Sequence, residues 1–122
     1  MRLLADGNMG HAFIHACLRL KGDFPIIHIA DWRNGAHRTS EDPVLLEALR
    51  EHNMIVIGFD RSSMGRHAGE LTRNGSGHAG VILFRRSVSQ SDYGKQSRVL
   101  VNFWKEAAEW DWADRIEYLP RG

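Results

Sequence analysis

Two carboxylates stand at corresponding places in the chain, each directly after a short apolar run. Asp6 ends the run that begins at Arg2, and Asp60 follows the run from Met54 to Phe59. Short runs rich in apolar, often β-branched, side chains are typical of buried β-strands. If these two strands are parallel neighbours, both carboxylates emerge at the carboxyl edge of the sheet, where open α/β sheets bind ligands. We therefore place Asp6 and Asp60 at the centre of a candidate site.

Two further acids, Glu41 and Asp42, begin the predicted helix that leads into the second of these strands. The loop before such a helix lies near the same edge, so three or four carboxylates can converge there. Clustered carboxylates repel unless a cation neutralises them, and oxygen ligands suit Mg²⁺ or Mn²⁺. Such metals activate water and stabilise phosphate oxygens during phosphodiester cleavage. Taken separately, Glu41 and Asp42 are better explained by the helix dipole. An Asp at a strand end often caps a turn, but two separate strands that end in the same way favour a functional role for Asp6 and Asp60.

Basic side chains fall at the same predicted edge. Arg61 follows the Asp60 strand, Arg85 and Arg86 follow the next predicted strand, and Arg38 lies in the polar loop 31–40. A rim of guanidinium groups beside a metal suits a gripped phosphate backbone. The same groups could instead form ion pairs with the carboxylates and close the site. Spacing alone leaves both interpretations open.

The histidines form no comparable pattern. His11 and His15 stand four residues apart and can share one face of a helix. A zinc site would need at least one further ligand, and none is evident in the sequence. The tryptophans near the end, Trp104, Trp110 and Trp112, are better explained as packing residues than as a stacking platform for bases.

Strands and helices are predicted to alternate along the whole chain. This order predicts an α/β fold with a mostly parallel five-stranded sheet and helices on both faces, a Rossmann-like three-layer sandwich. The strand order 2-1-3-4-5 would make the Asp6 and Asp60 strands neighbours at the switch point. Residues 1–122 are predicted to form a single domain. Strands are expected at 2–6, 24–30, 54–59, 80–84 and 115–119, and helices at 11–20, 41–52, 66–73 and 95–110.

The composition is that of an ordinary globular domain. Of the 122 residues, 43% are hydrophobic, and the net charge of +1 gives no overall attraction to nucleic acid or membrane. The single cysteine, Cys17, lies in an apolar helical pattern, which indicates a buried thiol and a reducing compartment. No transmembrane run or signal peptide is evident, so a cytoplasmic location is expected.

Four segments, read in order, resemble the small bacterial PIN-like proteins. Residues 3–8 resemble their Leu-Ala-Asp-Glu-Asn opening, and residues 39–46 resemble their Ala-Ser-Asp-Glu-Glu-Ile-Leu segment. Residues 55–61 are similar to their Val-Leu-Val-Thr-Phe-Asp-Lys strand, and residues 78–85 to their Gly-Val-Ile-Leu-Leu-Arg strand. The resemblance extends to about residue 86 and implies a PIN-like fold.

Members of the wider PIN superfamily are largely metal-dependent ribonucleases, many of them toxins of toxin–antitoxin pairs. The resemblance thus implies a Mg²⁺- or Mn²⁺-dependent ribonuclease, with Asp6, Glu41 and Asp60 as metal-site carboxylates. The partners it leaves open are RNA, an antitoxin protein and a second copy of the chain. Two family acids are missing here, because Gly7 and Ser62 stand in their places. Their loss removes negative charge and would weaken metal binding.

Two other functions remain open from the sequence. The chain could be a PIN-like module with a decayed site that binds RNA or a protein partner through its arginines. It could also be a receiver-like phosphoacceptor with Asp60 as its target, since receivers carry Asp after their first and third strands. That alternative needs a lysine after the fifth strand, where Pro120 and Arg121 stand instead.

Overall fold

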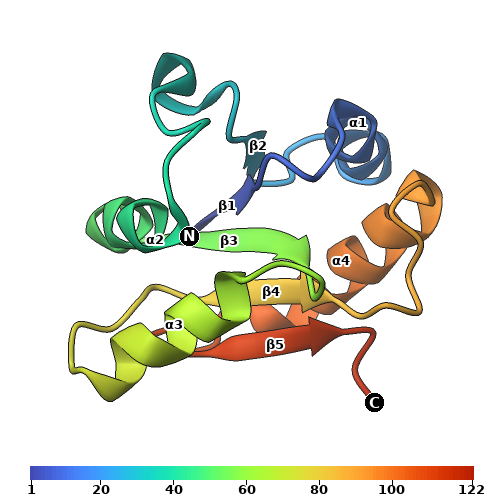
Figure 1. Cartoon of the computed structure of the whole chain (residues 1–122). Coiled ribbons are helices and arrows are strands. Elements are labelled where there is room, and N and C mark those ends of the chain that lie inside the picture. Colours follow the sequence, from blue (N-terminus) through green and yellow to red (C-terminus); the bar gives the residue numbers. More distant parts are fainter.

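The computed structural model describes residues 1–122 and contains five strands and four α-helices, which alternate along the sequence (Figure 1). The strands are β1 (Arg2–Ala5), β2 (Ile26–His28), β3 (Met54–Phe59), β4 (Val81–Phe84) and β5 (Ile116–Leu119). The helices are α1 (His11–Leu20), α2 (Asp42–Glu51), α3 (Met64–Arg73) and α4 (Tyr93–Ala107).

The five strands form one sheet with the order β2-β1-β3-β4-β5, and every neighbouring pair is parallel. The predicted α/β class and five-stranded sheet are confirmed, and the sheet is parallel throughout. The chain leaves β1 toward β2 on one side and returns to β3 on the other, so the switch point lies between β1 and β3. In the register of this pair, Ala5 lies opposite Ile57.

The alternation of side chains along each strand divides the core into two layers. On one face, Leu3, Ile55 and Phe84 pack with residues of α1 and α4. On the other face, Leu4 and Val56 pack with residues of α2 and α3. Both faces of β3 and β4 are buried, which is why these strands read as continuous apolar runs.

The central strands match their predicted bounds closely, whereas the edge strand and some helix ends differ. Strand β2 spans only 26–28 instead of 24–30, because it pairs on one side only, with the short strand β1. Helix α3 begins at Met64 rather than at 66. Helix α4 covers 93–107 instead of 95–110, and it begins where the Asp92 side chain accepts a hydrogen bond from the Lys95 backbone N–H.

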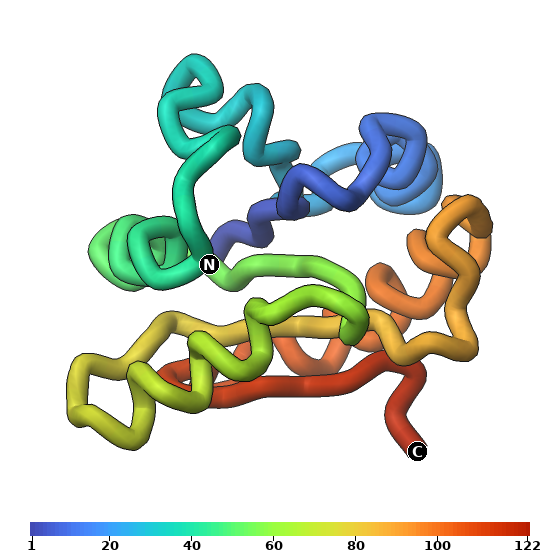
Figure 2. The backbone as a smooth tube through the Cα atoms, viewed as in Figure 1, coloured from blue at the N-terminus to red at the C-terminus, as the bar shows by residue number.

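The segment between β2 and α2 extends away from the sheet, as the tube in Figure 2 shows. Its short 3₁₀ segment contains Arg33 and Asn34 with φ of 51° and 57°, in the left-handed region. The ring of Trp32 is buried in the core layer that contains Leu45 and Leu49, which fixes this segment against the domain, and it stacks on His37 of the same segment. None of the helices is both long and apolar enough to cross a membrane, and the longest, α4, has 15 residues.

Candidate functional site at the carboxyl edge

Asp6 lies at the carboxyl end of β1 beside the switch point, and it is buried, with 6% of its surface exposed. It continues the alternation of Leu4 and therefore projects onto the α2 and α3 face of the sheet. Its Oδ1 accepts the Asn8 backbone N–H at 2.9 Å. On the neighbouring strand, Gly58 leaves room for the carboxylate, since a Cβ there would lie 2.5 Å from Asp6 Oδ2.

Burial raises the pKa of Asp6 from 3.8 to about 6. The backbone N–H groups of Asn8 and Met9 lower this pKa, and the charge of Asp42 raises it. The burial that favours the protonated acid also strengthens the attraction of the ionised carboxylate for a nearby cation. A buried carboxyl that titrates near neutral pH in this way is a feature of functional sites.

Asp42 is the predicted acid that the structure brings into electrostatic contact with Asp6. It is half-buried as the first residue of α2, and its Oδ2 accepts the hydroxyl hydrogen of Ser63 at 2.7 Å. Ser63 precedes α3, so this bond joins the N-terminal ends of α2 and α3. Glu41 directly precedes α2 but is exposed, and its side chain makes no capping hydrogen bond.

Asp60 follows β3 and is half-buried. Its backbone N–H donates to the carbonyl of Phe84 at 2.9 Å and continues the pairing of β3 with β4. The structure contains no group of three or more His, Cys, Asp or Glu side chains placed to hold a metal ion together. Of the four predicted carboxylates, Asp6 and Asp42 interact, whereas Glu41 and Asp60 do not complete a cluster of three with them.

The carboxylates of Asp6 and Asp42 are donors of the kind that suits both predicted metals, Mg²⁺ and Mn²⁺. Mg²⁺ is commonly held by one or two carboxylates, with water and substrate phosphate filling the remaining positions. Asp6, which is buried, and Asp42, which is half-buried, are the residues that would contribute the carboxylate oxygens of such a shell. The hydroxyl of Ser63, already bonded to Asp42, fixes the orientation of the second carboxylate.

A histidine that the sequence did not point to holds the loop after Asp6. His28, at the end of β2, is buried, and its Nδ1 accepts the Ala30 backbone N–H at 3.0 Å. Its Nε2 must then carry the ring proton, which it donates to the carbonyl of Met9 at 2.7 Å. His11 stacks on this ring at 4.1 Å and contacts Asp31, rather than pairing with the other histidine of α1. Because His28 lies within an apolar strand, its spacing gives no indication of this role.

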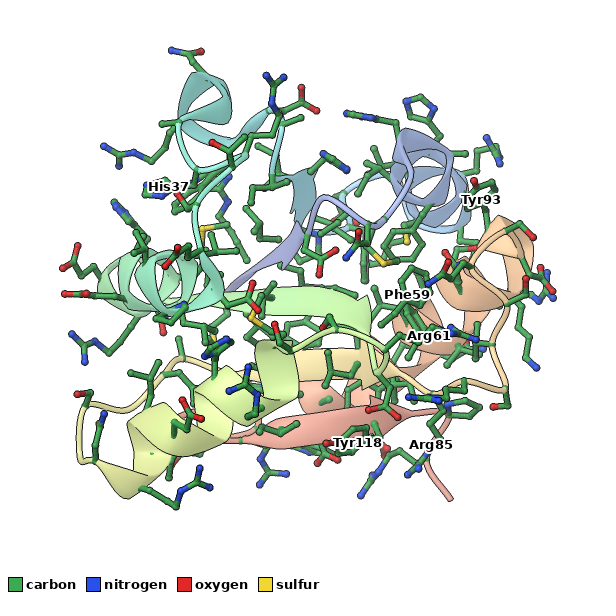
Figure 3. The ribbon with its side chains drawn as sticks, in the orientation of Figure 1. His37, Phe59, Arg61, Arg85, Tyr93 and Tyr118 are labelled. Atoms are coloured by element: carbon green, nitrogen blue, oxygen red, sulfur yellow. The ribbon has the colours of Figure 1, made fainter.

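The predicted arginine rim divides into two parts. Arg61 donates from Nη2 to the carbonyl of Arg86 at 3.4 Å, and both line one polar hollow. Arg85 lies outside this hollow. Its Nε donates to the carbonyl of Pro120 at 2.8 Å, and its guanidinium lies over the ring of Tyr118 (Figure 3). Arg38 is exposed in the loop before α2.

None of these four arginines forms an ion pair with a carboxylate. The alternative in which the guanidinium groups neutralise the carboxylates is therefore not what the structure contains. Arg61 and Arg86 keep their charge available to a ligand.

No protein-family model, curated protein or solved structure matches this chain. The protein is therefore classified by its fold and by the residues of its candidate site. It is a parallel α/β protein with a buried acid beside the switch point of its sheet and a basic hollow in the loops that follow β3 and β4.

Proposed function

We propose that this protein is a PIN-like ribonuclease that uses Mg²⁺ or Mn²⁺. The observation that carries the proposal is the buried carboxyl of Asp6 beside the switch point, whose pKa is raised to about 6 by burial and, to a smaller extent, by the charge of Asp42. A protein keeps a carboxylate in such a place at a cost in stability, and cation binding is a physical reason for doing so.

In this proposal Asp6 and Asp42 hold the metal ion, which when bound would activate water and stabilise phosphate oxygens. Asp60 and Glu41, whose side chains make no hydrogen bonds or ion pairs, bind or orient the water molecules around it. Arg61 and Arg86 bind a phosphate group of the RNA through charge-assisted hydrogen bonds. The hydrogen bond from Ser63 keeps the Asp42 carboxylate in position.

The direct test is calorimetric titration of Mn²⁺ into wild-type protein, Asp6→Asn and Asp60→Asn, followed by incubation with a labelled RNA. We expect saturable binding and RNA cleavage by the wild type, loss of both in Asp6→Asn, and loss of cleavage in Asp60→Asn. Asp23→Asn is the matched control, because that carboxylate is exposed, lies before β2 at the amino edge of the sheet and pairs only with Lys21. RNA cleavage that survives Asp60→Asn, or depends equally on Asp23, would contradict the assignment.

A second candidate function is a PIN-like module that binds RNA or a protein partner without cutting RNA. It is favoured by the lack of a three-ligand cluster and by Gly7 and Ser62 at positions where the resembling family has acids. Under this proposal the wild type binds RNA but neither binds Mn²⁺ nor cleaves. A toxin role would add an antitoxin protein as a partner, and co-expression with the product of a neighbouring gene tests it.

A further inference from the structure

A polar hollow of about 550 Å³ lies where the loop after β4 meets the residue that follows the Asp60 strand end. It is lined entirely by polar and charged residues, namely Arg61, Arg86, Ser87, Ser89, Gln90 and Ser91. We call it the Arg61–Arg86 hollow. Both arginines come from positions directly beyond the carboxyl ends of β3 and β4, so the hollow shares an edge of the sheet with Asp6 and Asp60.

The charges in the hollow favour an anion. Its lining contains two guanidinium groups and no carboxylate, and neither arginine forms an ion pair. The hydroxyl groups of Ser89 and Ser91 are hydrogen-bonded to each other at 3.1 Å, which leaves one hydroxyl proton free to donate to a ligand. Paired guanidinium groups with hydroxyl donors are the groups that proteins use to hold phosphate oxygens.

The loop that forms one wall of the hollow is fixed from below by a buried glutamine. Gln96 of α4 is completely buried, and its Nε2 donates to the carbonyl of Ser89 at 2.8 Å. The same carbonyl accepts the Asp92 backbone N–H at 3.2 Å, and Val88 anchors the loop in the core. Gln96 Oε1 has no hydrogen-bond partner, although burying an unpaired amide oxygen costs stability. A loop held at this cost presents its serine hydroxyl groups in a defined arrangement.

We propose that the Arg61–Arg86 hollow binds a phosphomonoester dianion, such as the terminal phosphate of an RNA strand. A monoester carries a charge between −1.5 and −2 at pH 7, which matches two guanidinium groups, whereas a phosphodiester within the strand carries a single charge. The proposal depends on the proposed function only for the RNA that carries the phosphate. If the protein is the proposed nuclease, a strand end held in the hollow would lie at the carboxyl edge of the sheet, the edge that also carries Asp6.

The test compares short labelled RNAs with a 5′-phosphate, a 3′-phosphate or hydroxyl ends. Binding is followed by fluorescence anisotropy in EDTA, so that no metal-dependent cleavage takes place. We expect one terminal phosphate to tighten binding about tenfold, the effect of one charge-assisted hydrogen bond. Inorganic phosphate is the competitor. If inorganic phosphate competes at a concentration close to that of the phosphorylated strand, the hollow binds free phosphate. If inorganic phosphate competes only weakly, the hollow binds the phosphate at the strand end.

Arg86→Gln should abolish the gain from the terminal phosphate, and Ser91→Ala should reduce it without changing the charge. Arg85→Gln is the matched control, since the adjacent guanidinium lies against Tyr118 and Pro120 instead of in the hollow. Circular dichroism checks that each variant is folded. Equal affinity for phosphorylated and unphosphorylated strands, or an equal loss in Arg85→Gln and Arg86→Gln, would overturn the proposal. Because no cleavage is measured, these outcomes are independent of whether the protein is a nuclease.

Discussion

At the scale of single residues, Asp6 combines two opposing requirements. Burial favours its protonated form and raises its pKa to about 6, whereas cation binding requires the ionised form. A shift of about two pH units corresponds to roughly 3 kcal/mol between the two protonation states. The folded protein therefore holds the proton of Asp6 more tightly than the unfolded chain does. Its contribution to stability is fully present below pH 3.8 and is lost as the pH rises through 6.

Replacing this carboxyl by an amide should therefore stabilise the protein at alkaline pH. We expect Asp6→Asn to raise the free energy of unfolding at pH 8 by up to about 3 kcal/mol and to change it little at pH 4. Urea denaturation of the variant and the wild type at both pH values measures this difference. Asp23→Asn, at an exposed position, should show no such trend. A stability gain in Asp6→Asn that is the same at both pH values would show that Asp6 ionises as freely as a surface acid.

Gly58 provides the space that the Asp6 carboxylate occupies. A Cβ at this position would lie 2.5 Å from Asp6 Oδ2, which is too close without movement. We expect Gly58→Ala to cost about 1–3 kcal/mol in stability and to weaken Mn²⁺ binding by displacing the carboxylate. Gly22→Ala is the control, because nothing lies within 4 Å of a Cβ there. Calorimetry and urea denaturation of both variants give the two quantities. Wild-type Mn²⁺ affinity in Gly58→Ala would argue against Asp6 as a ligand.

At the scale of elements, the loop from Asp6 to α1 is held by a strand that is distant in sequence. The His28 ring accepts a hydrogen bond from the Ala30 N–H, just after β2, and donates one to the Met9 carbonyl. It therefore ties the loop to β2. The loop in turn supplies the Asn8 N–H that contacts Asp6. His28 is thus a positioning residue for the candidate ligand.

We expect His28→Gln to release this loop, because a glutamine amide cannot reproduce both ring hydrogen bonds in place. The loss of two hydrogen bonds should destabilise the protein by about 2 kcal/mol. Amide hydrogen exchange at Ala30 should become faster, since its N–H donates to the histidine ring. His15→Gln, on the exposed side of α1, is the matched control. Unchanged exchange at Ala30 in His28→Gln would show that the ring does not hold this turn.

The sequence predicts best the strands that are buried on both faces. Strand β3 is buried at every position, and its predicted bounds are the observed ones. Strand β2 is half-buried at Ile26 and Ile27, and its length depends on the short partner β1. An apolar run shows that a strand exists, but the pairing partner sets where it ends, and that information lies elsewhere in the chain.

At the scale of the whole molecule, the sheet order brings Asp6 and Asp42 together although they are far apart in sequence. The alternation of strands and helices predicts a mostly parallel sheet, and a strand order of 2-1-3-4-5 then places the acids near one edge. The alternation does not determine which of these acids come close together, because that depends on how far α2 and α3 extend over the sheet. The separation of Arg85 from Arg86 follows from simpler geometry, since consecutive side chains leaving a strand point to opposite faces.

The two edges of the sheet should respond to pH in opposite directions. At the amino edge, burial lowers the pKa of His78, although the charge of Asp114 opposes this shift. His78 therefore resists protonation when folded, and its contribution to stability is lost as the pH falls below 6.5. Asp6 at the carboxyl edge lowers stability as the pH rises through 6. We expect His78→Asn to gain stability relative to the wild type at pH 5, and Asp6→Asn to gain it at pH 8.

Because the two groups lie at opposite ends of the strands and share no partner, their effects should add within about 0.5 kcal/mol. The asparagine in His78→Asn can accept the Gly80 N–H that the ring accepts at 3.1 Å, so the turn is kept. Urea denaturation of the two single variants and the double variant from pH 5 to pH 8 measures the sum. A double variant that departs from additivity by more than this would mean that the two edges are coupled through β3 and β4, so that protonation at one edge changes the packing at the other.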